Sequence, residues 1–348
     1  MKKIAILGHF GGNEEFLDGQ TVKTKILYDE LSAQTEWNIQ KLDTYWKNKK
    51  PIRLVISTLW ALILRKDIIV LLSINGMKTF FPILSFFSRH WNVRVFHDVI
   101  GGNLDKYVAK YPKFRGYLNS FTENWVETET LKKGLEKGGV HNCEVVPNFK
   151  RLTITKLEES PKPCGEPYRF CTFSRVMKEK GIETAINAVE QINNDNGRRL
   201  CTLDIYGVVD RTYQDDFDRI MSKSTDAIHY CGVVPYNESV ETIKDYFALL
   251  FPTFWDGEGF PGTIVDAFSA GLPVIASDWN SNGEIVNDGK NGILYPGNIA
   301  ESLKQAMVYL IENSEQMMAL KKQCIADAQK YQPELHVKRL IKILERTR

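Results

Sequence analysis

Cysteine is sparse in this sequence, with six residues in 348, and no two of them form a CxxC pair. Zinc fingers and ribbons typically show such pairs, and disulfide-stabilised domains show a much denser spacing. Neither kind of site is expected here. We therefore interpret the cysteines as buried thiols in a reducing compartment.

Long apolar runs are also absent. The longest, Ile52–Leu64, is interrupted by Arg53 and is shorter than the roughly 20 residues that a membrane span needs. The apolar run Ile4–Leu7 is too short for a signal peptide and predicts a first strand. The sequence has no internal repeat, so a solenoid is not expected. These absences predict a cytoplasmic protein that does not span a membrane.

Neither sign of charge dominates, because 45 Lys and Arg stand against 43 Asp and Glu, a net charge of +2. The two halves differ, however. Residues 1–150 hold 22 Lys and Arg against 15 Asp and Glu, a balance of +7, and the remainder holds 23 against 28, a balance of −5. The first half is therefore the basic one. We expect no nucleic-acid partner.

Strand-like and helix-like runs alternate along the chain, a pattern typical of parallel sheets flanked by helices. The predicted strands are Ile4–Leu7, Trp37–Leu42, Ile68–Leu72, Val93–His97, Trp125–Glu127, Cys143–Val146, Arg169–Ser174, Leu200–Tyr206, Ile228–Cys231, Ala248–Phe251 and Pro273–Ala276. Prolines and charges crowd residues 151–167, as in a linker between domains. We predict an α/β protein with two doubly wound domains, 1–150 and 168–333, which face each other across a cleft.

A glycine-rich turn, GHFGG at Gly8–Gly12, follows the first predicted strand. Glycine lets a backbone approach a phosphate closely. The pattern is not the dinucleotide fingerprint, and no acidic residue clearly ends the second predicted strand, as that motif requires. A tight turn explains the glycines equally well.

Two cations follow the predicted strand Arg169–Ser174, namely Arg175 and, five residues later, Lys180. At the mouth of a cleft, such a pair can neutralise a diphosphate. Charged loop residues are more often merely solvated, so their position after a strand is what favours a function. His97 and Asp98 likewise end a strand in the first half, although a lone histidine has many structural explanations.

The segment Pro252–Glu284 is the most informative part of the chain. It places Glu258 on a glycine-flanked loop, with seven residues between it and Asp266 in the helix that follows. The start of a helix offers free N–H groups to a phosphate, and carboxylates beside it can bind hydroxyls, which suggests a site for a sugar nucleotide. Thr263 and Asp266 also match a T-x-x-D capping box, a structural role that can coexist with binding. Glu258 has no such local explanation.

At these residues the sequence resembles a retaining glycosyltransferase of the GT-B type, glycosyltransferase family 4. The E-x7-E motif of that family is matched by Glu258 and Asp266, its G-R-x-x-x-x-K-G by Ser174–Gly181, and its A-x-G-x-P-V by Ala270–Val274. The similarity covers about residues 145–296 and is thin before them. It implies a GT-B fold of two Rossmann-like domains, with a C-terminal helix, about 334–348, that crosses back to the first domain.

The resemblance also implies an activity: transfer of a sugar from a nucleotide-diphosphate sugar, UDP- or GDP-hexose, to a hydroxyl of a glycan or lipid-linked saccharide, with retention and without a metal or cofactor. It implies a role in bacterial cell-surface polysaccharide or glycoconjugate synthesis. The predicted catalytic residues are Arg175, Lys180, Glu258 and His97, and the predicted donor-binding residues are Gly11, Gly12, Gly259, Phe260, Pro261, Gly262, Thr263, Ile264 and Asp266.

Within this scheme the implied roles differ. Arg175 and Lys180 hold the departing diphosphate, Glu258 binds sugar hydroxyls, Asp266 binds the ribose, and His97 lies near the sugar. Asp266 replaces the usual second glutamate of the family and is one methylene shorter. Ribose binding then needs a slightly closer helix or a bridging water.

Two other functions fit the same residues. A nucleotide-sugar epimerase or phosphorylase keeps the fold, although a phosphorylase needs a pyridoxal lysine and no segment singles one out. A sugar-nucleotide-binding module without catalytic power would also retain Arg175, Lys180 and Glu258.

The sequence motifs say less about where the acceptor binds. The basic segment Trp46–Arg53 and the pair Arg65 and Lys66 flank an apolar helix candidate, and Phe80–Phe87 is aromatic. Basic residues beside apolar surface suit a peripheral contact with the inner face of a membrane, and a lipid-linked acceptor. Ordinary core helices with solvated ends explain the same pattern.

Overall fold

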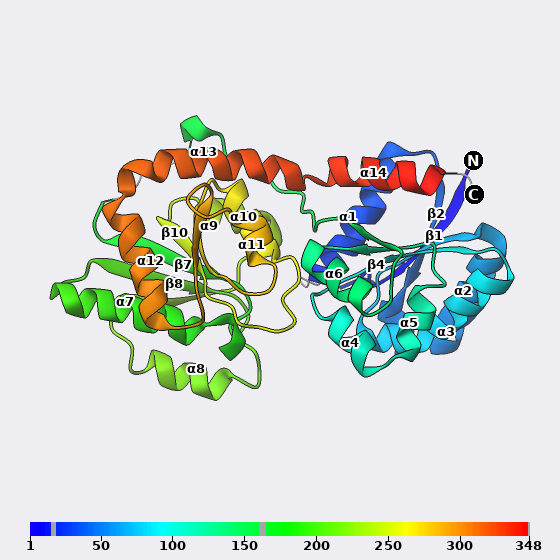
Figure 1. The fold of residues 1–348 in the computed structure, drawn as a ribbon, viewed down its shortest axis with the longest axis horizontal. Helices are drawn as coiled ribbons and strands as arrows, with labels where there is room; N and C mark the ends of the chain where they lie inside the picture. Colours follow the sequence, from blue (N-terminus) through cyan, green and yellow to red (C-terminus); the bar gives the residue numbers. More distant parts are fainter. Residues whose placement is uncertain (15–18, 160–164, 347–348) are drawn as a thin grey trace. The chain divides into compact units, whose positions relative to one another are not determined.

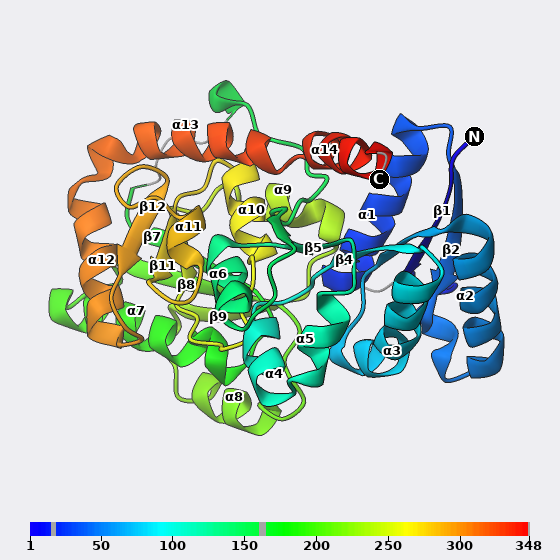
Figure 2. The same ribbon diagram turned by 45° about the vertical axis from the view of Figure 1, so that its right-hand side comes forward.

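The computed structural model describes residues 1–14, 19–159 and 165–346. Its contacts divide the chain into two units, which are shown in Figures 1 and 2. Unit 1 comprises Met1–Arg151 together with Gln332–Arg348, and unit 2 comprises Leu152–Tyr331. The chain therefore returns to its first unit after completing the second.

Unit 1 is built on a six-stranded parallel sheet of order β2-β1-β3-β4-β5-β6. Its strands are β1 (Lys3–Gly8), β2 (Asn38–Asp43), β3 (Asp67–Val70), β4 (Arg94–Asp98), β5 (Glu123–Val126) and β6 (Cys143–Val145). The central strands are continuous apolar runs, because helices cover both faces of the sheet.

The helices of unit 1 are α1 (Gly19–Gln34), α2 (Pro51–Arg65), α3 (Ile74–His90), α4 (Leu104–Lys110), α5 (Lys113–Leu118), α6 (Glu129–Lys137) and α14 (Pro333–Glu345). Figure 1 shows α1 and α14 above the sheet and α2 to α5 below it. Helix α14 packs along α1 and buries Val337, Leu340, Ile343 and Leu344.

Arg94 fixes the end of α14 to the sheet. Its guanidinium donates to the carbonyl oxygens of Leu344 and Arg346, at 2.8 and 2.7 Å, and its Nε donates to Asp67 at 2.7 Å. The last carbonyl groups of a helix have no partners within the helix. Arg94 donates a hydrogen bond to two such carbonyl groups, so α14 is held by hydrogen bonds as well as by apolar packing.

Unit 2 repeats the architecture with a second parallel sheet of order β12-β11-β10-β7-β8-β9. Its strands are β7 (Tyr168–Phe173), β8 (Cys201–Tyr206), β9 (Ile228–Gly232), β10 (Ala248–Phe251), β11 (Val274–Ser277) and β12 (Gly292–Tyr295). Its α-helices are α7 (Ile182–Asn196), α8 (Gln214–Met221), α9 (Ser239–Ile243), α10 (Gly262–Ser269), α11 (Asn282–Ile285), α12 (Ala300–Glu312) and α13 (Met317–Ala328).

The chain changes units between Arg151 and Leu152, at the start of the predicted linker. Leu152 packs against the core of unit 2, and the Thr155 amide donates to the Ser269 carbonyl at 2.8 Å. Part of the linker segment is therefore fixed to unit 2. The centre of this segment, residues 160–164, lies outside the described residues.

In each unit the strand order reverses at one point. In unit 2 the reversal lies between β7 and β10, and in unit 1 between β1 and β3. Ligands of doubly wound sheets bind at the carboxyl ends of the strands beside such a reversal. The loops after β7 and β10 carry Arg175, Lys180 and Glu258. The strand order therefore predicts a ligand site at the same residues as the sequence motifs do.

The α/β prediction with two doubly wound parallel sheets is confirmed, and each predicted strand is present. The sequence analysis did not predict β12, a four-residue edge strand that follows a turn at residues 289–291. Among the described residues, no helix is both long and apolar enough to cross a bilayer.

Truncation of Leu340 tests how far unit 1 depends on α14. Leu340 is fully buried, so Leu340→Ala should lower the stability of unit 1 by about 2–5 kcal/mol through lost burial and an unfilled cavity. Hydrogen exchange read by mass spectrometry should show the loss of protection in peptides of unit 1 only. Leu335→Ala on the same helix is the matched control, because Leu335 is 58% exposed. Equal effects of the two substitutions would contradict this role of α14.

Candidate functional site

The structure brings Lys180 and Glu258 together at the carboxyl edge of the unit 2 sheet. The Lys180 ammonium lies 2.5 Å from Glu258 Oε2, and the two side chains are only 10% and 6% exposed. The same carboxylate oxygen accepts a hydrogen bond from the Thr253 hydroxyl at 2.9 Å. Two of the predicted catalytic residues, 78 positions apart, thus form one partly buried ion pair.

Backbone contacts between two loops create this pair. Gly181, which follows Lys180, has φ +71°, and a Cβ there would lie 2.1 Å from the Pro252 carbonyl oxygen. The lack of a side chain lets the loop after β7 lie against the loop after β10. The Phe254 amide then donates to the Glu179 carbonyl at 2.8 Å. Glycine at position 181 is therefore required by the close approach of the two loops.

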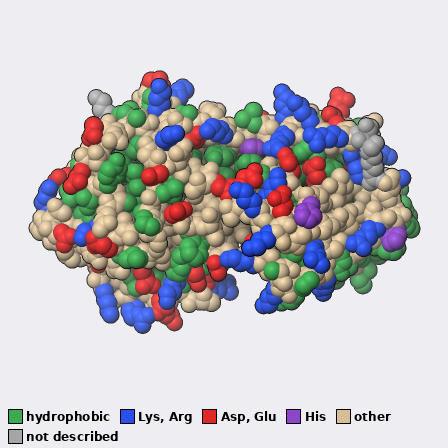
Figure 3. Space-filling view, viewed as in Figure 1, with side chains coloured by type: hydrophobic (Ala, Val, Ile, Leu, Met, Phe, Trp, Pro, Cys, Tyr) green, Lys and Arg blue, Asp and Glu red, His purple; other side chains and the backbone are tan. Residues whose placement is uncertain are grey.

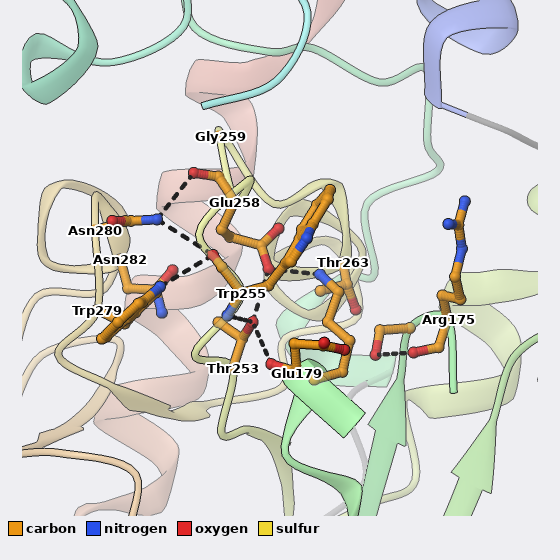
Figure 4. A network of polar contacts seen from close by, with 12 residues as sticks. Arg175, Glu179, Thr253, Trp255, Glu258, Gly259, Thr263, Trp279, Asn280 and Asn282 are labelled. Atoms are coloured by element: carbon orange, nitrogen blue, oxygen red, sulfur yellow. Dashed lines mark hydrogen bonds and ion pairs between the residues drawn. The ribbon is translucent and has the colours of Figure 1, made fainter. Parts of the chain in front are cut away.

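Trp255 forms one wall of the pair. The Lys180 ammonium lies 5.0 Å from the centre of its ring and 5.3 Å from that of Phe251, both within reach of a cation–π interaction. The Trp255 carbonyl accepts from the Trp279 indole at 3.0 Å and the Asn280 amide at 3.3 Å. Figure 4 shows Trp255, Trp279 and Asn280 grouped around Glu258. Thr253, Trp255 and Asn280 were not predicted as site residues, because their contacts with Glu179, Lys180 and Trp255, respectively, join different loops.

The predicted donor-binding segment, residues 259–264, leads into α10. Gly259 accepts a hydrogen bond from Ser281 at 2.8 Å, Phe260 stacks edge-on against Tyr331, and Ile264 is buried in the core. Pro261 is the N-cap and Gly262 the first helical residue. The segment is therefore a fixed turn whose backbone leads directly into a helix start.

The expected capping box does not form. The N-cap is Pro261, which makes no side-chain capping bond, and the Thr263 hydroxyl donates to the Phe173 carbonyl on β7 instead. Asp266 is 2% exposed, and its Oδ1 accepts a hydrogen bond from Ser239 at 2.9 Å. The capping interpretation of Asp266 is wrong because Thr263 lies inside the helix and anchors it to the sheet.

Arg175 lies apart from the pair. It lies two residues after β7, its side chain is 59% exposed, and its guanidinium lies 4.0 Å from the Asp210 carboxylate. In Figure 4 its guanidinium extends away from Glu258. Arg175 is thus a solvent-exposed cation at the same sheet edge, whereas the charge of Lys180 is paired with that of Glu258.

In unit 1 the glycine-rich turn is held by Asp43, a residue that was not predicted to contact it. Asp43 is the last residue of β2, and its carboxylate accepts from the amides of Phe10 and Gly12, both at 2.9 Å. The expectation that no acidic residue ends the second strand is therefore wrong. Gly11 and Gly12 have φ +85° and +58°, and a Cβ on Gly12 would lie 2.5 Å from the Tyr45 ring. Asp43 shapes this loop before any ligand arrives.

His97 is buried at the end of β4, in edge-on contact with the Phe81 ring. Its Nδ1 lies 3.3 Å from Asn124 Oδ1, and the Asn124 amide group donates to the Leu118 carbonyl, so we assign the proton of His97 to Nδ1. Nε2 then has no partner among the described residues. Burial lowers the pKa of His97 to about 4. A neutral ring follows at neutral pH.

Beside His97 lies a buried ion cluster. The Lys23 ammonium contacts Asp98 at 2.7 Å and Glu127 at 3.0 Å, with Lys23 3% and Asp98 0% exposed. Burial alone would lower the pKa of Lys23, but the two carboxylates outweigh it and raise that pKa. The cluster joins α1 to the ends of β4 and β5. Asp98 Oδ2 has no hydrogen-bond partner within the described chain.

The cysteines and acids of the described residues form no cluster of three or more that suits a metal ion. The five described cysteines are free, and four of them are buried.

Comparison with known proteins agrees with this geometry. Residues 167–313 match the family described as Glycosyl transferases group 1. An uncharacterized glycosyltransferase of Methanocaldococcus jannaschii is 24% identical over 197 residues, 54% of this chain and 48% of that protein. The GtfA subunit of a UDP-N-acetylglucosamine peptide N-acetylglucosaminyltransferase from Streptococcus gordonii is 30% identical over 174 residues, 49% and 33% of the two chains. The chain thus spans about half or less of these relatives.

Solved structures match along the whole chain. Anabaena Alr3699/HepE in complex with UDP superposes with a TM-score of 0.75 at 14% identity, covering 99% of both chains. Sucrose-phosphate synthase from Thermosynechococcus elongatus gives 0.74 at 15% identity, covering 99% and 98%. The fold is that of the GT-B glycosyltransferases. Together with the family match over residues 167–313, these likenesses support the resemblance to a GT-B glycosyltransferase.

Substitution of Gly181 tests the contact that positions Lys180. Gly181→Ala should destabilise unit 2 by clearly more than the 1–2 kcal/mol of a left-handed alanine, because its Cβ would also meet the Pro252 carbonyl. Gly197→Ala is the matched control, with φ +58° and no atom within 4 Å of the added Cβ. Urea unfolding followed in unit 2 measures both. Equal losses would show that close approach is not the constraint.

The burial of His97 predicts a pH dependence. Between pH 6.5 and 4 the unfolded chain binds a proton at this residue and the folded chain does not, so stability falls as the pH falls. A shift of this size corresponds to about 3 kcal/mol between pH 7 and pH 4. Wild-type protein should lose about that much more stability than His97→Gln over this range. A proton NMR titration that gives an ordinary pKa for His97 would contradict the assignment.

Proposed function

We propose that the protein is a glycosyltransferase that moves a hexose from a nucleotide-diphosphate sugar to a hydroxyl of a glycan or lipid-linked saccharide, with retention of configuration and without a metal. The observation that carries this proposal is the Lys180 and Glu258 pair, beside the start of α10 and the exposed Arg175. Relatives that act in polysaccharide synthesis, such as the amylovoran glycosyltransferase AmsK of Erwinia amylovora, favour the same class of pathway.

The unit 2 edge offers each part of the donor a partner. The diphosphate has the Lys180 ammonium and Arg175, two cations at the end of β7, together with the backbone at the start of α10. Glu258 can exchange part of its contact with Lys180 for sugar hydroxyls, because a carboxylate accepts several hydrogen bonds. Asp266, already bonded to Ser239, is the proposed ribose ligand.

In the proposed step the bond between the sugar C1 and the diphosphate oxygen breaks, and its electron pair leaves with the diphosphate. The acceptor oxygen bonds to C1 on the same face, and its proton passes to the departing diphosphate oxygen. Lys180 and Arg175 stabilise the charge that develops on the leaving group, which is the main electrostatic requirement of the reaction. The resemblance implies that His97 lies near the sugar, and its neutral ring offers Nε2 as a hydrogen-bond acceptor without adding charge.

Replacement of the two cations tests this function. Lys180→Ala and Arg175→Ala should each lower the rate of nucleoside-diphosphate release by about 100-fold or more, since each removes a stabilising charge from the leaving group. Lys178→Ala and Arg211→Ala are matched controls, because both are exposed cations of unit 2 outside the pair, and they should retain the rate. Normal turnover by both test variants would overturn the assignment.

The same assay identifies the donor and the outcome. UDP- and GDP-hexoses are first compared by thermal stabilisation, which a bound donor raises by mass action. Acceptor-dependent release of nucleoside diphosphate separates a transferase from an epimerase, which releases little, and from a binding module, which releases none. Anomeric coupling constants in the product report retention, and activity in EDTA reports the need for a metal.

A further inference from the structure

Helix α2 of unit 1 is apolar on both sides. Leu54, Thr58, Ala61 and Leu62 are buried, and the helix packs over β1, β2 and β3. On the opposite side, Ile52 is 74% exposed, Ile56 48%, Trp60 57%, Ile63 43% and Leu64 65%. A helix that is apolar all round is normally covered all round. The sheet accounts for only one side of α2.

The exposed residues form one stripe. Their positions, 52, 56, 60, 63 and 64, follow the spacing of a single helix face. At 1.5 Å per residue the stripe is about 18 Å long. Arg53 is the one charged residue that shares this face, and it lies in the first turn. Figure 3 shows hydrophobic side chains gathered at the lower right, where Figure 1 places α2 and α3, with Lys and Arg beside them.

A cationic pocket adjoins the start of the stripe. It has a volume of about 450 Å³, and Lys41, Lys50 and Arg53 line it together with Trp46. Asp43 is its one carboxylate, and both of its oxygens already accept amide hydrogen bonds from Phe10, Gly12 and Tyr45. Neighbouring Lys47 and Lys49 add two further positive charges. The pocket therefore favours an anion.

The cations of the pocket are not committed to protein anions. Lys50 lies 5.1 Å above the Trp46 ring, and Lys41 lies 3.8 Å from the centre of the Tyr28 ring. Within residues 1–14, 19–159 and 165–346, no carboxylate lies at ion-pair distance from Lys41, Lys50 or Arg53. Their ammonium and guanidinium groups are available to phosphate, for which both have the right chemistry.

We propose that this face of unit 1 binds the surface of an anionic phospholipid bilayer. The stripe of Ile52, Ile56, Trp60, Ile63 and Leu64 enters the boundary between headgroups and acyl chains, and the pocket cations receive lipid phosphates. An apolar face with a basic rim is how interfacial helices bind membranes, and tryptophan favours that depth. Because the rim is positively charged and the headgroups are negatively charged, we assign the surface to an anionic bilayer.

The position of the face matters for the proposed function. Helix α2 begins just after β2 ends, so its first turn and the pocket lie at the carboxyl edge of the unit 1 sheet, the edge that also holds His97. A lipid-linked acceptor kept in the bilayer would meet the protein at this edge. The membrane contact itself does not rest on the transfer reaction, because it is measured without donor or acceptor.

Vesicle flotation with the full chain tests the proposal. Wild-type protein should float with vesicles of equal phosphatidylglycerol and phosphatidylcholine in 50 mM NaCl, and much less with phosphatidylcholine alone. Ile56→Ser with Trp60→Ser should weaken binding by about tenfold or more through lost apolar contact. Lys41→Gln, Lys50→Gln and Arg53→Gln together should weaken it similarly and reduce its salt dependence, since each basic residue near the surface adds attraction.

Matched controls distinguish binding through this surface from nonspecific binding of the protein to vesicles. Leu335→Ser removes a 58% exposed leucine elsewhere in unit 1, and Lys113→Gln, Lys133→Gln and Lys137→Gln remove the same charge from exposed positions on α5 and α6. Both control proteins should float like wild type, and all variants should keep the wild-type melting temperature. Wild-type protein that stays in the soluble fraction, or controls that lose binding equally, would overturn the proposal.

A second copy of the chain is the competing occupant. Size-exclusion chromatography with light scattering gives the mass of wild-type protein and of the Ile56→Ser, Trp60→Ser variant. A dimer of the wild type that this variant dissociates, without flotation of either, would assign the face to self-association and reject the membrane. A monomer that floats supports the bilayer.

Discussion

All six strands of each sheet run parallel, and this constraint governs where chemistry can occur in the molecule. Parallel strands place every strand end that leads into a helix at one edge, so residues far apart in sequence meet there. In unit 2 the loops after β7 and β10 converge, and in unit 1 those after β1, β2, β4 and β5 do so. Each predicted site residue of the chain lies at the end of a strand, in the loop that follows it, or in the helix that the loop leads into. The remainder of each unit supports that edge.

The Lys180 and Glu258 pair combines two demands that pull in opposite directions. In the proposed reaction the cation must be available to the leaving group, and yet an unpaired ammonium is costly to bury. Glu258 and the Trp255 ring compensate the charge of Lys180 while the donor is absent. The exposed Arg175 needs no such compensation, because water solvates it. One edge thus holds a largely buried cation, Lys180, and an exposed one, Arg175.

The alternation of strands and helices sufficed to predict the fold, because continuous apolar runs identify buried parallel strands. Motif spacing also identified Lys180 and Glu258. It could not identify Lys23, since α1 shows little apolar periodicity and Lys23 acquires its role from Asp98 and Glu127, 75 and 104 residues away. Asp43 was missed because the predicted strand stopped one residue early. Trp255 and Thr253 depend on contacts across loops, which no local pattern records.

The return of the last helix to unit 1 has a consequence for the order of folding during synthesis. Unit 2 is one continuous stretch, so all of its residues have been made once Tyr331 has emerged. Unit 1 begins first but lacks α14 until residues 333–345 are translated, and α1 meanwhile exposes the apolar surface that Leu340 and Leu344 later cover. Unit 1 is therefore completed on the ribosome only after unit 2.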